Sequence, residues 1–165
     1  MTTGKNIFVH PTAVIGEFVT IGDNCYIGPL CIIGYPAEWK NMEHNDCGVL
    51  IGSGTRITGA VTIDSGTKEP TIIGMDCYLM KHSHVGHDAV IGNDVTVSCG
   101  AKIGGHVKVG AFTNIGLNAV IHQRCEVPMG CMIGACAFIG KKTILNEYRK
   151  YAGVPAKDIG SNHPL

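Results

Sequence analysis

Aliphatic side chains recur at every sixth position through most of this chain. The pattern starts at Val9 and runs to Ile33, resumes at Ile51, and after a second break continues from Ile73 to Ile139. Four positions after each aliphatic residue stands a second column, which carries small side chains such as Cys, Ser, Ala, Val and Thr. Two columns that stay in phase over such a length indicate a six-residue structural unit, repeated along one axis.

Each repeat predicts one short strand followed by a sharp corner. Successive strand residues point to opposite faces, so the aliphatic side chains point inward and stack in columns. Three strands complete one coil of eighteen residues. Each strand then pairs with the strand above it, at roughly 4.8 Å, which satisfies the backbone hydrogen-bonding groups. The predicted fold is therefore all-β, a parallel β-helix in the form of a triangular prism.

Two breaks in the repeat predict excursions from the prism. The first covers residues 35–49 and contains Trp39, the only tryptophan of the chain, and the second covers Ser65–Thr71. Insertions are tolerated at corners, but we expect the first loop to reach over a neighbouring subunit. We predict a β-helix at residues 1–145. A C-terminal tail at 146–165, with a short strand or helical turn, would cap the open end of the prism.

Composition and charge agree with a narrow interior and exclude some partners. Of the 165 residues, 23 are glycine and only 6% are aromatic, which favours a core of small and branched side chains. Thirteen Lys and Arg residues balance thirteen Asp and Glu residues. No net field therefore favours nucleic acid or an anionic membrane. No apolar stretch reaches the length of about 18 residues that a membrane span needs.

The cysteines and the N-terminus favour a cytoplasmic protein. The segment Met1–Asn6 is polar and carries no signal-peptide core. Eight cysteines are present without a CxxC pair, and several of them keep the register of the repeat: Cys25, Cys31, Cys125 and Cys131. We interpret these four as small buried core residues in a reducing compartment.

Histidines gather on one side of the predicted prism. His87, His106 and His122 are 19 and 16 residues apart, close to the length of one coil, so they lie along one edge in successive coils. His84 falls in the same corner region as His87. Histidine is the side chain best suited to proton transfer near neutral pH, which makes this edge a candidate catalytic site. The alternative is an exposed polar ladder without chemistry.

The segment Leu79–Asp88, which reads LMKHSHVGHD, resembles the active-site segment of the UDP-N-acetylglucosamine acyltransferases of lipid A synthesis. The resemblance continues in GGHV at 104–107 and VIHQ at 120–123, and it covers residues 8–145. It implies the left-handed coils of the hexapeptide-repeat family and a homotrimer with active sites between subunits. It also implies transfer of an acyl group to a hydroxyl or amine of a nucleotide-linked sugar.

The resemblance also implies roles for single residues. His87 matches the general base, Asp88 the residue that orients it, and Gly105 the backbone N–H donor to the oxyanion. Alternation along a strand would instead turn Asp88 away from His87 and toward His106. The residues matched to binding of the sugar, its phosphates or the acyl donor are His84, His106, His122 and Gln123. Glu38 and Lys40 of the first loop match an acid and a lysine that hold sugar hydroxyl and phosphate.

Two departures leave the substrates open. Asp64 stands where the resembled family usually has a histidine. The chain ends at Leu165 without the helical C-terminal domain of that family, and its Ala152–Lys157 segment looks more like CoA-dependent sugar acetyltransferases. We expect no bound cofactor, and either acyl-CoA or an acyl carrier protein thioester as the donor.

Two other functions compete with acyl transfer. Some hexapeptide-repeat proteins, the γ-class carbonic anhydrases, bind zinc with histidines at a subunit interface. His82 and His87 have a spacing that such a site would use, but the second histidine usual in that family would fall on Gly92. A zinc-dependent hydratase is therefore the alternative enzyme. A structural trimer that has lost catalysis is the alternative without chemistry.

Overall fold

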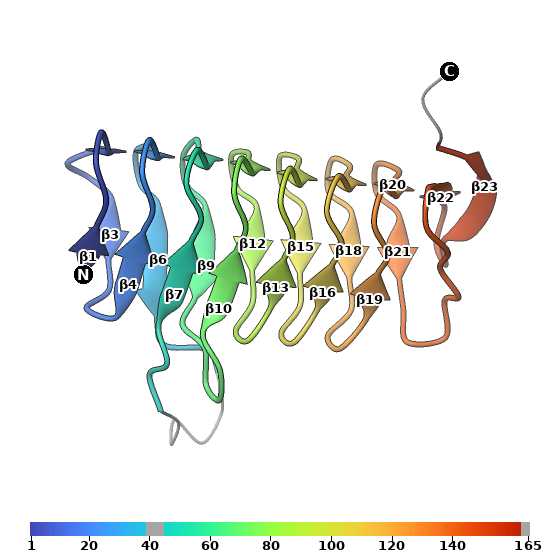
Figure 1. Cartoon of the computed structure of the whole chain (residues 1–165). Helices are drawn as coiled ribbons and strands as arrows, with labels where there is room; N and C mark the ends of the chain where they lie inside the picture. The colour runs from blue at the N-terminus through green and yellow to red at the C-terminus, as the bar shows by residue number, and fades with distance from the viewer. Residues whose placement is uncertain (39–44, 163–165) are drawn as a thin grey trace.

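The protein is a parallel β-helix, shown in Figure 1 as a computed structural model that describes residues 1–38 and 45–162. Its strands form three sheets, and the described residues contain no helix. The predicted all-β parallel β-helix is thus confirmed. Accordingly, no helix in the described ranges is long and apolar enough to cross a membrane.

Up to β21, successive strands of the chain lie in successive sheets. The first sheet contains, in spatial order, β1 (Thr2–Thr3), β4 (Val19–Ile21), β7 (Val49–Ile51), β10 (Thr71–Ile73), β13 (Val90–Ile91), β16 (Lys108–Val109) and β19 (Glu126–Val127). The second contains β2 (Phe8–Val9), β5 (Tyr26–Ile27), β8 (Arg56–Ile57), β11 (Tyr78–Leu79), β14 (Thr96–Val97), β17 (Asn114–Ile115), β20 (Met132–Ile133), β22 (Arg149–Ala152) and β23 (Lys157–Ser161). The third contains β3 (Val14–Ile15), β6 (Ile32–Tyr35), β9 (Thr62–Asp64), β12 (His84–Val85), β15 (Lys102–Ile103), β18 (Val120–Ile121) and β21 (Phe138–Ile139).

The six-residue repeat sets the register between coils. In the first sheet Ile73 pairs with Ile91, and Ile91 pairs with Val109, each eighteen residues further along the chain. These three side chains are at most 3% exposed, whereas Val90, one residue before Ile91, is 37% exposed. The aliphatic column therefore forms the core, and the residue before it faces outward, as the alternation predicts.

Most corners have a left-handed backbone at one position of the repeat. Asp88, His106 and Arg124 occupy the same corner in three successive coils, with φ of +57°, +58° and +63°. Asp and His are among the non-glycine residues enriched in this region. The left-handed corner thus accommodates Asp88 and His106 at this edge of the prism.

The predicted core thiols are buried. Cys25, Cys31, Cys125 and Cys131 are at most 7% exposed, and all eight cysteines of the chain are free. Burial raises the pKa of each of these four thiols, so they stay protonated near neutral pH. They act as small apolar side chains of the core, as predicted.

Two segments leave the prism between neighbouring coils. The first follows β6, which ends at Tyr35, and precedes β7; the second lies between β9 and β10. Both project from the lower edge in Figure 1. Trp39 and Lys40 lie outside the described residues, so a reach of the first loop over a neighbouring subunit stays a prediction.

The described parts of the two excursions are hydrogen-bonded to each other. The Gly48 N–H donates to Ser65 Oγ at 2.8 Å, and the Cys47 N–H donates to the Gly66 carbonyl at 2.9 Å. These bonds connect the base of the first excursion to the second. The second excursion is also the segment that contacts Asp88, as described below.

The chain ends in a hairpin beyond the last coil. β22 pairs in parallel with β20, and β23 folds back antiparallel to β22. The Arg149 guanidinium donates to both carboxylate oxygens of Asp158, at 2.8 and 2.9 Å. The tail was expected to form a short strand or a helical turn, and its described residues form strands. The boundary at residue 145 and the capping role of the tail stay predictions.

Candidate active site

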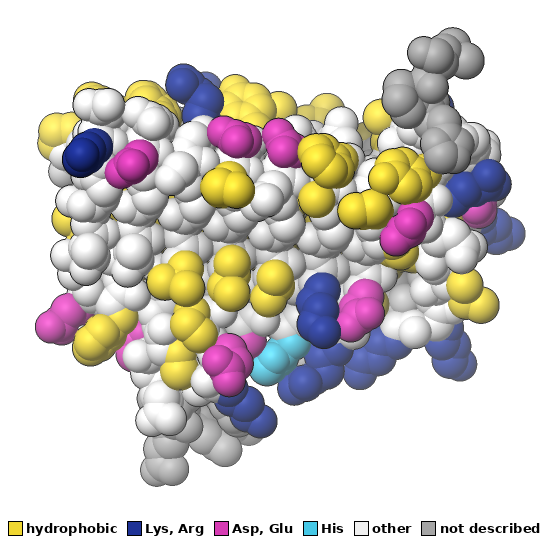
Figure 2. Space-filling model, in the orientation of Figure 1, with side chains coloured by type: hydrophobic (Ala, Val, Ile, Leu, Met, Phe, Trp, Pro, Cys, Tyr) yellow, Lys and Arg dark blue, Asp and Glu magenta, His cyan; other side chains and the backbone are white. Residues whose placement is uncertain are grey.

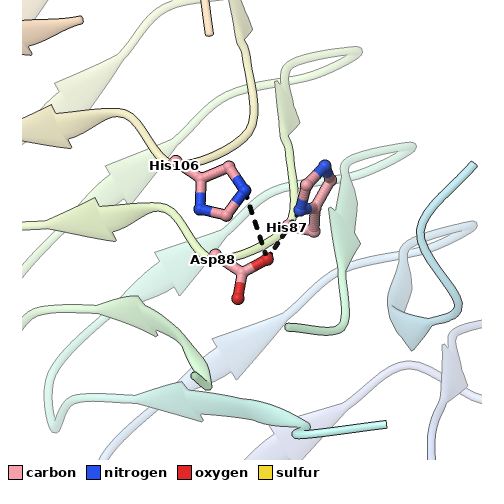
Figure 3. Close-up of side chains that lie close together, drawn as sticks. All are labelled: His87, Asp88 and His106. Carbon is pink, nitrogen blue, oxygen red and sulfur yellow. Dashed lines mark hydrogen bonds and ion pairs between the residues drawn. The ribbon is translucent and has the colours of Figure 1, made fainter. Parts of the chain in front are cut away.

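The histidine edge lies where the third sheet turns into the first. His87, His106 and His122 directly or closely follow β12, β15 and β18, in three successive coils. The rings of His87 and His106 meet edge to face, with centroids 4.9 Å apart. His122 instead lies beside Phe138, with ring centroids 6.4 Å apart. The predicted edge is present, but only the first two histidines form a cluster (Figure 3).

Asp88 contacts both histidines of this cluster. Its Oδ2 lies 2.6 Å from His87 Nδ1 and 3.9 Å from His106 Nε2, as the dashed lines in Figure 3 mark. The expectation that strand alternation would turn Asp88 away from His87 is therefore wrong. Asp88 stands at a corner with φ of +57°, not in a strand, so alternation does not apply to it.

The second excursion surrounds the Asp88 carboxylate with donors. The N–H groups of Lys68 and Glu69 donate to Oδ1 at 2.8 and 2.9 Å, and the Thr67 hydroxyl donates to Oδ2 at 2.8 Å. Burial alone would raise the pKa of Asp88, but the Glu69 N–H, His87, the Lys68 N–H and Thr67 together hold it well below its usual range. Asp88 is therefore ionised at neutral pH and can only accept hydrogen bonds.

The ionised Asp88 fixes the tautomer of His87. A carboxylate acceptor at 2.6 Å requires His87 Nδ1 to carry the proton. Nε2 of the neutral ring then has a free lone pair and can accept a proton from a bound substrate. This arrangement would suit a general base and an acid that orients it.

Gly105 lies next to Nε2 of the His87 ring. A Cβ at this position would be 2.6 Å from His87 Nε2, so only glycine leaves room for the imidazole. Among the described residues, none accepts a hydrogen bond from the Gly105 N–H. A Cβ on Gly86 would lie 2.7 Å from the Gly105 nitrogen, so the absence of a side chain at Gly86 leaves the Gly105 N–H uncrowded. An unused N–H beside a base can stabilise an oxyanion.

His87 and Gly105 line one cavity of about 600 Å³, which we call the His87 cavity. Its polar wall consists of Glu38, Thr62, Asp64, His84, His87 and Lys102. Its remaining lining comes from Ile32, Tyr35, Pro36, Ile63, Gly86 and Gly105. The cavity therefore joins the third sheet, the His87 corner and the start of the first excursion.

Two of the predicted binding residues belong to this cavity. His84 points outward from β12, with its Nδ1 2.8 Å from the Thr62 hydroxyl and its Nε2 3.7 Å from Asp64 Oδ2. Glu38 is exposed and lines the cavity from the described start of the first excursion. Lys40, predicted beside it, lies outside the described residues.

The other predicted binding residues lie elsewhere along the edge. His122 lines a second cavity of about 510 Å³ together with Phe138, Lys141 and Lys142, which we call the His122 cavity. Gln123 is exposed and lines neither cavity. Figure 2 shows Lys and Arg side chains gathered on the lower edge, toward the C-terminal end from a histidine side chain. The His87 cavity thus carries two carboxylates and one lysine, whereas the His122 cavity carries two lysines.

His106 lies behind the base and outside the His87 cavity lining. Burial lowers its pKa, Asp88 opposes that effect, and Arg124 adds to it. Within the described ranges, the one group of donor atoms close enough to hold a metal ion comprises His87, Asp88 and His106, within 4.8 Å of one another. His82 does not belong to it, so the spacing that suggested zinc does not bring His82 and His87 together in such a group.

Sequence reasoning missed several residues that build the site. The N–H donors of Thr67, Lys68 and Glu69 carry no signal in the repeat, because they belong to an irregular excursion. Gly86 was visible only as one of many glycines that follow an aliphatic residue. Asp64 was visible as a departure from the resembled family, but its place in the cavity was not.

Comparison with known proteins places the chain among its relatives. A family model described as "Bacterial transferase hexapeptide (six repeats)" matches residues 1–35 and 70–105. The acyl-[acyl-carrier-protein]–UDP-N-acetylglucosamine O-acyltransferase of Campylobacter concisus is 31% identical over 145 residues, covering 86% of this chain and 55% of that protein. The corresponding Campylobacter jejuni protein is 40% identical over 126 residues, covering 74% and 48%.

Solved structures give the same result. The UDP-N-acetylglucosamine acyltransferase of Campylobacter jejuni superposes with a TM-score of 0.90 at 29% identity, covering 97% of this chain and 63% of that one. LpxA from Acinetobacter baumannii superposes at 0.92 with 27% identity, covering 98% and 64%. A mirror-image coil would not superpose, so this chain has the left-handed coil that the resemblance implies.

Fold and site together define a hexapeptide-repeat protein with a left-handed parallel β-helix. More particularly, a hexapeptide-repeat transferase model matches two stretches of the chain, and the chain is related to the UDP-N-acetylglucosamine acyltransferases. It spans 55% of the Campylobacter concisus relative and 63% of the Campylobacter jejuni structure.

Proposed function

We propose that this protein is an acyltransferase that moves an acyl group from a thioester to a nucleotide-linked sugar, with His87 as general base. The observation that carries the proposal is the pairing of His87 with Asp88 beside the unused N–H of Gly105, at the wall of the His87 cavity. Base, orienting acid and oxyanion donor are the three groups that acyl transfer requires.

The transfer follows from this geometry. His87 Nε2 removes the proton from the acceptor as its oxygen or nitrogen attacks the thioester carbonyl carbon. The tetrahedral oxyanion receives a hydrogen bond from the Gly105 N–H. When the C–S bond breaks, the imidazolium of His87, stabilised by ionised Asp88, returns the proton to the departing sulfur.

The remaining residues would bind the substrates. His84 and Glu38 line the His87 cavity, where the acceptor sugar would lie. His122, with Lys141 and Lys142 beside it, lies toward the basic end of the edge, which suits phosphate groups of the sugar nucleotide or of the donor. The roles of Gln123, Lys40 and His106 in binding rest on the family resemblance.

The donor would be acyl-CoA or an acyl carrier protein thioester, consumed as a co-substrate without a bound cofactor. The curated relatives carry the acyl carrier protein in their names. We also propose a cytoplasmic homotrimer with active sites between subunits. Free cysteines suit a reducing compartment, and exposed Val14, Ile32 and Val120 along the outer face of the third sheet suit packing against another subunit.

The test is thiol release from acetyl-CoA, longer acyl-CoA and acyl carrier protein thioesters with a panel of UDP- and dTDP-sugars, with and without chelator. Chelator-resistant turnover with a new acylated sugar in the mass spectrum supports the proposal. No turnover with any pair, together with bound zinc, would replace it with a zinc-dependent hydratase. No turnover and no metal would leave a structural trimer.

A further inference from the structure

One short turn of the second excursion surrounds the Asp88 carboxylate with consecutive backbone N–H groups. The N–H groups of Lys68 and Glu69 donate to Oδ1 at 2.8 and 2.9 Å, and the Thr67 N–H lies 3.2 Å from both oxygens. Successive N–H groups that converge in this way form an anion-binding nest. Because their two shortest bonds both reach Oδ1, the backbone of the turn acts mainly on that oxygen.

The fold fixes the position of this turn. A Cβ on Gly66 would lie 1.7 Å from the Glu69 carbonyl oxygen, so the turn closes more tightly than a residue with a side chain would allow. Ser65 is 1% exposed, and its hydroxyl oxygen accepts a hydrogen bond from the Gly48 N–H at 2.8 Å. Thr67 is therefore held in place from both sides, before any substrate binds.

The Thr67 side chain acts on the other carboxylate oxygen. Thr67 is 6% exposed, and its hydroxyl donates to Asp88 Oδ2 at 2.8 Å. The same Oδ2 lies 2.6 Å from His87 Nδ1, whereas His106 Nε2, at 3.9 Å, is beyond hydrogen-bonding distance. A carboxylate oxygen offers two lone pairs, so the hydroxyl takes one and leaves the other for His87.

Ionisation of Asp88 does not depend mainly on this hydroxyl. Burial raises the pKa of Asp88, and the Glu69 N–H, His87 and the Lys68 N–H lower it ahead of the Thr67 hydroxyl. The hydroxyl has two other effects on the pair of Asp88 and His87. It stops the carboxylate from turning about Oδ1, and it withdraws negative charge from the oxygen that accepts the His87 proton.

We propose that Thr67 is a positioning residue of the acyl transfer, whose hydroxyl directs Asp88 Oδ2 toward His87 and limits the negative charge on that oxygen. This inference rests on the proposed function. The hydroxyl keeps its hydrogen throughout, and the transferred proton moves only from the acceptor to His87 Nε2 and on to the departing sulfur. Thr67 thus tunes the base without touching the substrate.

The test compares variants that change only this hydroxyl. Thr67→Val removes it and keeps the shape of the side chain, and Thr67→Ser keeps it. Thr113→Val is the matched control, because Thr113 is 1% exposed and its hydroxyl donates to the Pro128 carbonyl at 3.0 Å, in another part of the prism. Thiol release as a function of pH gives kcat and the acid limb of kcat/KM. NMR titration of the His87 ring is the measurement that needs no turnover.

The variants leave the charged and titratable groups around the base in place. These groups come from several elements: Asp88 and His106 at the corners, Lys68 and Arg124 beside His106, Asp64 of β9, His84 of β12, Lys102 of β15, and Glu38. A change in the pH profile of Thr67→Val is therefore due to the lost hydroxyl.

We expect kcat of Thr67→Val to fall by about tenfold, because the carboxylate no longer holds its direction. The acid limb and the ring titration should move to higher pH by roughly 0.5–1 unit, because Oδ2 without the hydroxyl stabilises the imidazolium more strongly. Thr67→Ser should restore both, and Thr113→Val should change neither.

An acid limb that stays in place or moves to lower pH in folded Thr67→Val, or a Thr67→Ser protein that restores nothing, would overturn the inference while acyl transfer stands. If Thr67→Val does not fold, Thr67→Ala serves for the same measurements. No turnover by the wild type would overturn the proposed function, and the ring titration would then show whether the Thr67 hydroxyl acts on His87.

Discussion

The His87 imidazole fills the space that a side chain on Gly105 would occupy. The two residues are eighteen positions apart, so they stack in adjacent coils at the same corner. A Cβ on Gly105 would approach His87 Nε2 to 2.6 Å, which is closer than real Cβ atoms come. The repeat therefore does more than build the prism, because it places an imidazole and an uncrowded N–H side by side.

Gly105→Ala should abolish most of the activity and keep the fold. The added methyl would push the His87 ring away from the amide and from its hydrogen bond to Asp88. We expect kcat to fall by roughly 10²-fold, the scale of a lost base or oxyanion donor. The measurement is thiol release at saturating substrate, with the melting temperature as a check of folding.

Gly134→Ala is the matched control for this change. Its Cβ would meet no atom closer than 3.2 Å, and it would lie against Tyr151 and Ala152, away from the base. We expect it to retain activity within about twofold. Equal activity of Gly105→Ala and the wild type would contradict the assigned contact between Gly105 and His87.

Asp88→Asn should lose both activity and stability. An amide presents one acceptor oxygen and an N–H₂ group in place of the carboxylate, so some of the N–H groups of Thr67, Lys68 and Glu69 lose their partner. We expect a loss of about 1–3 kcal/mol in the free energy of unfolding. The activity should fall by roughly 10²–10⁴-fold, because His87 loses the acceptor that fixes its tautomer.

Asp94→Asn controls for the substitution itself, since Asp94 also stands at a corner with a left-handed backbone. Asparagine adopts that conformation readily, so neither change strains the chain. Urea unfolding and thiol release of the two variants, measured side by side, give the comparison. An Asp88→Asn protein as stable and as active as Asp94→Asn would refute the role given to this carboxylate.

Acid should remove the stabilisation that Asp88 supplies. Its pKa in the folded protein lies below the ordinary value of 3.8, so its contribution is complete above that value and is lost as the pH falls through the folded pKa. The difference in unfolding free energy between wild type and Asp88→Asn should therefore shrink below about pH 4. The pKa of Asp64 shifts the other way, but that contribution is common to both proteins and cancels. A difference that is constant from pH 7 to the acid limit would contradict this linkage.

The sequence alone predicted the coils because each inward position of every repeat is buried and must carry an apolar side chain. A polar residue at Ile91 or Ile103 would be buried without a partner, so the six-residue period is visible without any structure. The histidine edge follows from the same period. His87 and His106 meet because the spacing of nineteen residues is nearly one coil.

Irregular parts of the site could not be predicted in this way. The direction of Asp88 depends on a corner with φ of +57°, which strand alternation does not describe. The donors around it come from Thr67–Glu69, whose conformation no repeat dictates. Asp64 enters the cavity at a register shift between Ile33 and Tyr35 of β6, and such a bulge leaves little trace in the sequence.

The buried aliphatic column of the prism leads to a separate prediction about stability. Ile91→Ala removes a side chain that is 1% exposed inside the prism and should cost about 2–5 kcal/mol of unfolding free energy. Val90→Ala, on the next residue and the opposite face, should cost less than about 1 kcal/mol. Urea denaturation of the two variants tests this, and similar losses at both positions would contradict the assigned inward and outward faces.

The most direct test of the central claim is thiol release by wild type and His87→Ala, with the donor and acceptor pair that the substrate panel identifies. His10→Ala is the matched control, because His10 lies in the first coil and its ring Nδ1 is hydrogen-bonded to Thr12. The account predicts steady turnover by the wild type and by His10→Ala, and a loss of roughly 10²–10⁴-fold in His87→Ala with its melting temperature preserved. Undiminished turnover by a folded His87→Ala protein would show that His87 is not the base and would contradict the account.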